Sequence, residues 1–348
     1  MDEDFGSGGE ILFERRGAAG VITLNRPAAL NALNHRMILA LSRALAAWEA
    51  DDDIRLVVIK GEGRAFSAGG DILDVYRAGP GKASPAFFAD EYRLNAHIAC
   101  FKKPYVALTD GIVMGGGVGV SFHGSYRVMT ERAVFAMPEA GIGFFPDVGG
   151  SYLLSRIGGY GMYLALTGNR IARGDALRIG LATHAVDSAD LPAVLDRLAE
   201  TGDPDGALDD FCKNAPPETD EARFHSIERH FSLATLSDCL TSLEKGKDKG
   251  DEFASEALET IRTRSPTSVH VAFREVRYGA MLSMEECMRM EFRILNRMLK
   301  NHDFYEGIRA AIVDKTKDPV WRPASLEEVD PAAIDAFFAP LDEGELEL

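Results

Sequence analysis

The stretch from Met114 to Gly150 reads MGGGVGVSFHGSYRVMTERAVFAMPEAGIGFFPDVGG. It begins with three consecutive glycines, Gly115 to Gly117, and ends with two carboxylates, Glu139 and Asp147. Consecutive glycines let a backbone approach a ligand closely, because a longer side chain at these positions would block the approach. The stretch therefore predicts a binding site that has acidic groups downstream of it.

A second glycine-rich stretch, GEGRAFSAGGD, runs from Gly61 to Asp71 and follows an apolar run typical of a buried strand. Its Gly69 and Gly70 can present another bare backbone. Two such turns can direct two N–H donors at one oxygen, an oxyanion hole that stabilises a carbonyl gaining negative charge. Each glycine cluster alone is more typical of an ordinary turn or cap. Together they favour a site for an activated acyl compound.

The two carboxylates also have ordinary explanations. Glu139 follows Pro138, so it can be a first-turn glutamate that complements a helix dipole. Asp147 precedes an apolar helical segment, so it can be a turn or helix-entry residue. Two carboxylates near one site can instead divide the work of base or nucleophile and acid.

Composition limits the class of protein. The chain has 348 residues, of which 46% are hydrophobic and 26% charged, enough for a large core in one large domain with an appendage or in two domains. The net charge of −16 argues against a nucleic-acid partner. No apolar run approaches the roughly 18 to 20 residues of a membrane span. We therefore expect neither a nucleic-acid partner nor a membrane span.

Cysteine usage and the first residues bear on location. The four cysteines (Cys100, Cys212, Cys239 and Cys287) have no C-x-x-C spacing, which suits a reducing compartment and gives no metal framework. The start, MDEDFGSGGE, lacks the basic and apolar regions of a secretory signal and the arginines of a transit peptide. We expect a cytoplasmic protein with no bound metal.

Hydrophobic periodicity indicates an α/β fold in which strands alternate with helices. The segments 11–15 and 20–25 are typical of a hairpin. A helix is predicted after them, with an apolar face that begins at Leu30 and ends at Trp48. From these patterns we predict a flexible N-terminus at 1–10, a core with the active site at 11–201, a linker or excursion at 202–221, and a helical C-terminal region at 222–348.

The order of four motifs, RAFSAGGDI, KPYVAL, DGIVMGGGVG and FAMPEAGIGFFPDVGG, resembles the crotonase (enoyl-CoA hydratase/isomerase) superfamily. The resemblance runs from about Ile11 to Val329 and is strongest with the branch that hydrolyses 3-hydroxyisobutyryl-CoA in valine breakdown. It implies a spiral of ββα units, hydrolysis of a short 3-hydroxyacyl-CoA thioester, and no cofactor beyond the coenzyme A of the substrate. It also implies a possible homo-oligomer, a trimer or a hexamer.

The resemblance also implies roles for individual residues. The expected catalytic acids are Glu139 and Asp147, and the expected oxyanion-hole donors are the N–H groups of Gly70 and Gly116. Glu91 is expected to contact the substrate, although a solvated helix face is its ordinary explanation. The backbone at Phe66, Ser67 and Ala68 is expected to hold the adenine end of CoA. Glu139 either attacks the carbonyl or activates a water, and the sequence leaves both open.

Other functions fit the sequence less well. Hydratases of the superfamily have a second glutamate two residues after the glycine triplet, where this chain has Gly119, although isomerases use other carboxylates. A non-catalytic CoA-binding protein would have little use for both Glu139 and Asp147. The motifs of nucleotide-binding proteins, zinc peptidases and serine hydrolases do not occur.

Overall fold

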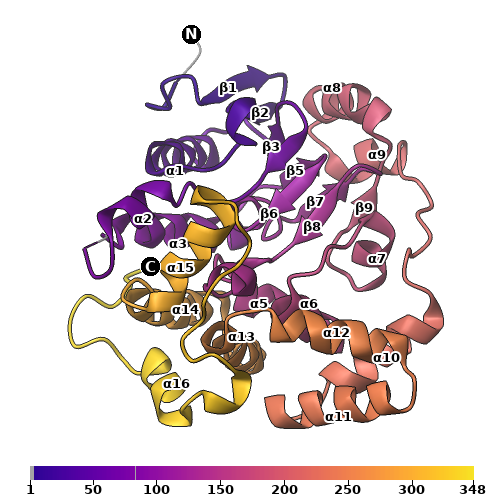
Figure 1. Ribbon diagram of the computed structural model, residues 1–348. Helices are drawn as coiled ribbons and strands as arrows, with labels where there is room; N and C mark the ends of the chain where they lie inside the picture. Colours follow the sequence, from indigo (N-terminus) through magenta and orange to yellow (C-terminus); the bar gives the residue numbers. More distant parts are fainter. Residues whose placement is uncertain (1–3, 83) are drawn as a thin grey trace. The chain divides into compact units, whose positions relative to one another are not determined.

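The structure, a computed structural model (Figure 1), describes residues 4–82 and 84–348 and divides into two compact units. Each unit is assembled from three separate segments. The described residues of Met1–Asp71, Ala86–Phe135 and Ile171–Glu218 form unit 1, and those of Ile72–Pro85, Ala136–Arg170 and Thr219–Leu348 form unit 2.

Unit 1 carries a six-stranded sheet with the order β1-β2-β3-β5-β7-β9. Its strands are β1 (Ile11–Arg16), β2 (Ala19–Leu24), β3 (Leu56–Gly61), β5 (Tyr105–Thr109), β7 (Tyr126–Met129) and β9 (His184–Ala185). The predicted hairpin is confirmed, because β1 and β2 pair antiparallel. The remaining neighbours pair in parallel. Parallel strands are covered on both faces, which explains why β2 and β5 are buried throughout.

A smaller sheet with the order β4-β6-β8 consists of β4 (Ala65–Ser67), β6 (Ile112–Met114) and β8 (Val134–Ala136). The helices of unit 1 are η1 (Pro27–Ala29), α1 (His35–Glu49), α3 (Ala86–Ala99), α4 (Gly116–Gly119), α7 (Arg173–Arg178), η3 (Ser188–Asp190), α8 (Leu191–Thr201) and α9 (Pro204–Asp209). Strand β6 ends directly before Gly115, and β4 ends one residue short of the Gly69–Gly70 pair.

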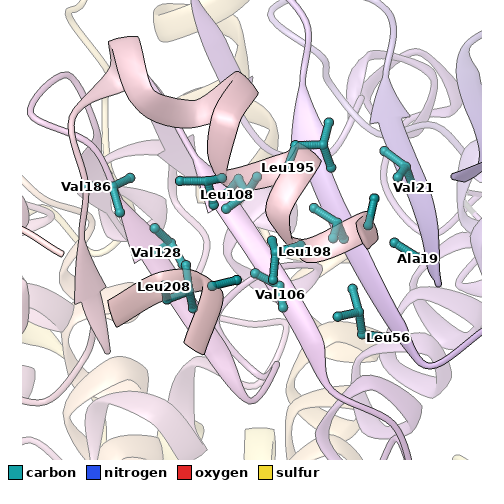
Figure 2. Close-up of a cluster of buried hydrophobic side chains, with 14 residues drawn as sticks. Ala19, Val21, Leu56, Val106, Leu108, Val128, Val186, Leu195, Leu198 and Leu208 are labelled. Atoms are coloured by element: carbon teal, nitrogen blue, oxygen red, sulfur yellow. The ribbon is translucent and has the colours of Figure 1, made fainter. Parts of the chain in front are cut away.

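Helices α8 and α9 cover one face of the larger sheet. Figure 2 shows Leu195 and Leu198 of α8 and Leu208 of α9 against strand residues that include Val106 and Leu108. All five side chains are buried. Each buried leucine or valine contributes roughly 1.5–3 kcal/mol relative to an exposed one, so this layer stabilises the larger sheet of unit 1.

The predicted first helix and its apolar face from Met37 to Trp48 are confirmed, but the predicted start at Leu30 is wrong. Helix α1 begins only at His35, after Asn34, whose side chain accepts a hydrogen bond from the N–H of Met37 at 3.0 Å. Leu30 instead has a positive φ of 52° and ends the short turn η1. The three-residue spacing of Leu30 and Leu33 therefore belongs to a turn and not to the helix. The N-capping residue Asn34 marks the start of the helix more reliably than the apolar spacing does.

Unit 2 is helical among its described residues, apart from the last residue of β8. Its helices are α2 (Leu73–Ala78), η2 (Glu139–Ile142), α5 (Gly150–Leu154), α6 (Gly158–Thr167), α10 (Glu221–Phe231), α11 (Leu236–Asp248), α12 (Glu252–Arg262), α13 (Pro266–Gly279), α14 (Met284–Met298), α15 (His302–Ile308), the π-helical η4 (Arg309–Val313), η5 (Leu326–Glu328) and α16 (Pro331–Phe338).

The segment 136–170 packs backbone to backbone against the C-terminal helices of unit 2. A β-carbon added to Gly279 of α13 would lie 2.2 Å from the carbonyl oxygen of Ser151. One added to Gly307 of α15 would lie 2.2 Å from the carbonyl of Ile142. Only glycine permits such approaches, so the C-terminal helices and the segment that carries Glu139 form a single packed body.

The sequence-based domain boundaries differ from this division. The predicted core, 11–201, includes the segments 72–85 and 136–170, which cluster here with the C-terminal helices. The predicted linker at 202–221 contains the helix α9. Of the predicted flexible start, residues 1–3 lie outside the described residues, whereas Ser7 is fully buried and Phe5 packs against Phe13. Among the residues that the structure describes, no helix has the length and apolar character needed to cross a membrane.

Candidate active site

The turn after β4 places the N–H of Gly70 outside the hydrogen bonds of unit 1. Gly69 accepts a hydrogen bond from the N–H of Leu33 at 2.9 Å, and Asp71 donates one to the carbonyl of Leu33 at 2.8 Å. Because neighbouring residues of an extended segment direct their backbone groups to opposite sides, the N–H of Gly70 faces away from Leu33. It is left for another acceptor.

Gly116 begins α4, so its N–H has no acceptor within the helix. The two glycine turns lie against each other: a β-carbon on Gly116 would be 3.3 Å from the nitrogen of Gly70, and one on Gly69 would be 3.8 Å from the nitrogen of Gly116. Within residues 4–82 and 84–348, no hydrogen bond uses the N–H of Gly70 or Gly116. Unit 1 therefore brings together two amides that can bind one oxygen.

Glu91 of α3 lies beside these amides. Its Oε1 would be 2.6 Å from a β-carbon on Gly116, and the residue is only 2% exposed. The ordinary explanation of Glu91 as a solvated helix face is therefore wrong. Asn95 follows one helical turn later and is fully buried, and neither polar atom of its side chain has a hydrogen-bond partner among the described residues. The sequence analysis missed Asn95, although its spacing from Glu91 places both on one face.

The three residues expected to hold CoA lie at the end of β4. The side chains of Phe66 and Ser67 are buried, and the hydroxyl of Ser67 donates to the carbonyl of Asn31 at 2.9 Å. The N–H of Ala68 is bonded to the carbonyl of Leu30 at 2.9 Å. Any contact with CoA would thus use the backbone carbonyls, and the assignment stays a prediction.

In unit 2, Glu139 is the first residue of η2 and is 6% exposed. Its Oε2 has no hydrogen-bond partner among the described residues. A buried acceptor without a donor is costly, so a fold keeps one mainly where a ligand supplies the donor. Burial, and then the negative charge of Asp147, raise the pKa of Glu139 well above its usual value. A carboxylate with a raised pKa is a stronger base at neutral pH.

Asp147 lies at a strained turn. It is 5% exposed, and its carbonyl accepts a hydrogen bond from the N–H of Gly150 at 2.8 Å. The next two residues, Val148 and Gly149, have positive φ angles of 52° and 83°. A β-branched residue in this region is a genuine outlier, and such conformations cluster at functional sites. The turn thus fixes the orientation of Asp147, and the strained backbone conformation of Val148 costs conformational free energy.

Two further buried carboxylates lie near this pair, Glu275 of α13 and Glu291 of α14, both 0% exposed. Glu291 accepts hydrogen bonds from the N–H groups of Gly149 (2.8 Å) and Ser151 (3.0 Å). The sequence analysis missed both glutamates, because they lie more than a hundred residues downstream of Asp147 and no motif marks them. Among the described residues, no group of three or more histidines, cysteines and acids is arranged to hold a metal ion.

The predicted site residues therefore fall into two sets. Gly70, Gly116 and Glu91 come together in unit 1, and Glu139 and Asp147 come together in unit 2. The first set offers donors for an oxygen that gains negative charge. The second set offers a carboxylate base or nucleophile with an acidic neighbour.

Comparison with known proteins adds three findings. Residues 19–338 match the profile of the Enoyl-CoA hydratase/isomerase family. The mitochondrial 3-hydroxyisobutyryl-CoA hydrolase of Danio rerio is 42% identical over 98% of this chain and 92% of that protein. Two solved structures are similar over 97% of this chain: a carnitinyl-CoA dehydratase from Mycobacterium thermoresistibile (43% identity, TM-score 0.90, 98% of that chain) and an enoyl-CoA hydratase from Rhodobacter sphaeroides 2.4.1 (37% identity, TM-score 0.86, all of that chain).

Proposed function

The chain belongs to the Enoyl-CoA hydratase/isomerase family, and we propose that it is an acyl-CoA thioester hydrolase that converts 3-hydroxyisobutyryl-CoA to 3-hydroxyisobutyrate and CoA. The observation that carries this proposal is the identity of 42% to a hydrolase of that name, spread over 98% of the chain. The fold implied by the resemblance is confirmed by solved members of the family. The neighbouring backbone amides of Gly70 and Gly116 in unit 1 support the chemistry.

In the proposed reaction the N–H groups of Gly70 and Gly116 bind the thioester carbonyl oxygen. Negative charge develops on this oxygen when the carbonyl carbon is attacked. Donors already in position stabilise that charge without reorganisation, and one such donor typically contributes about 10²- to 10³-fold in rate. Glu91, beside these amides, contacts the acyl part of the substrate.

Glu139 attacks the carbonyl carbon to form an acyl-enzyme anhydride, or it removes a proton from the water that attacks. In the first route the C–S bond breaks as the anhydride forms, and water then hydrolyses the anhydride and releases Glu139. In the second route water forms the new C–O bond directly and the C–S bond breaks. In both routes a proton reaches the leaving thiolate. Asp147 binds the 3-hydroxyl of the substrate or assists that proton transfer. The backbone of Phe66, Ser67 and Ala68 holds the adenine end of CoA, and the reaction needs no cofactor besides the CoA of the substrate.

Hydration of an enoyl-CoA is the second candidate, because the two similar solved structures are of a carnitinyl-CoA dehydratase and an enoyl-CoA hydratase. Adding water across a double bond generally uses two acid–base glutamates in this superfamily. The position of the second glutamate is Gly119, a buried glycine at the end of α4. The chain therefore lacks a side chain that this reaction would need.

A panel of CoA thioesters tests the proposal. We expect thiol release from 3-hydroxyisobutyryl-CoA and 3-hydroxypropionyl-CoA, with little hydration of crotonyl-CoA. Efficient hydration of crotonyl-CoA without thiol release would establish the second candidate instead. Tight binding of all three compounds with no turnover would identify a non-catalytic CoA-binding protein.

Location and assembly are further parts of the proposal. The names of the hydrolase relatives include the word mitochondrial, which does not support the cytoplasmic location expected from the sequence. The four free cysteines suit any reducing compartment. We propose that the protein is located in the cytoplasm, and cell fractionation can test this. A trimer or hexamer, as in relatives, is likewise proposed, with light scattering as its test.

A further inference from the structure

Glu291 holds the strained turn that carries Asp147. Besides the two N–H groups of Gly149 and Ser151, it accepts the hydroxyl of Ser151 at 2.5 Å. These donors belong to Gly149 and Ser151, directly after Val148. A strained backbone persists only where its surroundings determine it, and a buried carboxylate with three donors supplies such a constraint.

Glu275 lies beside this anchor and has the opposite surroundings. Neither oxygen of its carboxyl group has a hydrogen-bond partner among the described residues. The charged groups that act on it are Glu291, Asp147 and Glu139, in decreasing order, and all are acidic. Burial, and to a smaller extent the charges of Glu291 and then Glu275, raise the pKa of the nearby Cys287 thiol.

The cations on α13 and near α5 bind other acceptors. Arg156 donates to the carbonyl of Gly279 at 3.0 Å, Arg274 is paired with Asp335, and Arg277 donates to the carbonyl of Leu233. His270 of the same helix contacts the carbonyl of Leu326 at 3.1 Å. None of these is among the groups that act on Glu275.

The two glutamates differ in their hydrogen-bond donors, and this difference determines which of them keeps its proton to higher pH. Burial raises the pKa of both, that of Glu291 to about 8 and that of Glu275 well above its usual value of 4.5. The three donors at Glu291 favour its ionised form, and no donor does so at Glu275. Glu291 therefore ionises first.

We propose that Glu275 is a proton-bearing positioning residue, and that the neutral Glu275 and its anchoring neighbour Glu291 together fix the geometry and charge of the Asp147 turn. The proposal rests on the proposed hydrolase function, because it assigns two residues to the support of the same carboxylate pair. It has a direct consequence at alkaline pH. Once Glu275 ionises, an uncompensated charge arises beside Glu291 and Asp147, and the turn is disturbed.

The pH dependence of kcat/KM for thiol release from 3-hydroxyisobutyryl-CoA tests this consequence. Glu275→Gln cannot ionise, so its alkaline decline should lie at least about one pH unit above that of the wild type. The exposed Glu252 of α12 provides a matched control, and Glu252→Gln should follow the wild-type profile. Superposition of the Glu275→Gln and wild-type profiles would overturn the proposal. If Glu275→Gln does not fold, Glu275→Met supplies a neutral side chain of similar volume.

Two measurements do not depend on activity. The infrared spectrum at pH 7 should contain the carbonyl band of protonated carboxylic acids, and one component of this band should persist in Glu139→Gln and in Glu291→Gln but disappear after Glu275→Gln. In addition, a folded-state pKa raised above 4.5 means that stability is lost as the pH rises from that value. The ratio of folded to unfolded protein should thus fall by about tenfold more per pH unit in the wild type than in Glu275→Gln, up to the folded-state pKa.

These outcomes separate the two proposals. A wild type that releases no thiol from any CoA ester would refute the proposed function, and the infrared band and the stability slope would still decide the state of Glu275. A wild type that releases thiol but shows neither the band nor the slope would refute the role of Glu275 alone.

Discussion

The substitution Gly116→Ala tests the proposed oxyanion hole most directly. The added methyl group would lie 2.6 Å from Oε1 of Glu91 and 3.3 Å from the nitrogen of Gly70. The first distance is about 1 Å shorter than an ordinary van der Waals contact of about 3.5 Å, so either Glu91 or the turn must move. The methyl group would also occupy space beside both amides. The backbone conformation itself is no obstacle, because Gly116 lies in a helix and does not have a positive φ.

A displacement of about 1 Å at a reacting group can cost about 10²-fold in rate. Loss of one oxyanion donor costs about 10²- to 10³-fold, or roughly 2.7–4 kcal/mol. We therefore expect kcat/KM for thiol release from 3-hydroxyisobutyryl-CoA to fall by about 10²- to 10³-fold in Gly116→Ala, mainly through kcat. The assay is continuous detection of free thiol, with circular dichroism to establish that the variant is folded.

Gly206 of α9 provides the matched control. It also lies in a short helix of unit 1, and its added methyl group would meet only Oδ2 of Asp203, at 2.9 Å. Asp203 is exposed and can rotate away. Gly206→Ala should therefore keep wild-type activity. Wild-type kcat/KM in a folded Gly116→Ala would show that the N–H of Gly116 does not bind the reacting oxygen.

Three other predictions concern unit 2 and the core. Glu139→Gln should abolish thiol release while calorimetry still detects substrate binding, and full activity would remove Glu139 from the mechanism. Because the charge of Asp147 raises the pKa of Glu139, Asp147→Asn should move the acidic decline of the residual kcat/KM to lower pH; a shift to higher pH would contradict this coupling. Leu198→Ala should lower the free energy of unfolding by about 2–5 kcal/mol in urea titrations, whereas Leu12→Ala, at a residue 50% exposed, should change it by less than about 0.5 kcal/mol.

The parts of the site that lie in local motifs could be predicted from the sequence. The glycine pair at Gly69 and Gly70 and the triplet at Gly115 to Gly117 mark turns by residue type alone, and the structure places these turns in contact. Their mutual approach could not be derived from spacing, because it depends on the pairing of β4 with β6. The family resemblance supplied that link.

The surroundings of the carboxylates could not be predicted. Glu275 and Glu291 lie on helices that also carry exposed charged residues, and only tertiary packing shows that both glutamates are buried. The positive φ of Val148 is equally invisible, since valine is among the residues least suited to it. Backbone strain and buried charge occur mainly at functional sites, where the structure departs from the local preferences of the sequence.

The interleaving of segments in unit 2 has a consequence for synthesis of the protein. A growing chain emerges at about 5–20 residues per second, so Glu139 and Asp147 leave the ribosome well before α13, α14 and α15 exist. Until those helices are synthesised, Glu291 cannot accept the hydrogen bonds that hold the turn after Val148, and η2 cannot pack against Gly307. In a protein truncated before Glu275, Glu139 and Asp147 would thus lack the helices that fix their positions, even if the sheet of unit 1 had folded completely.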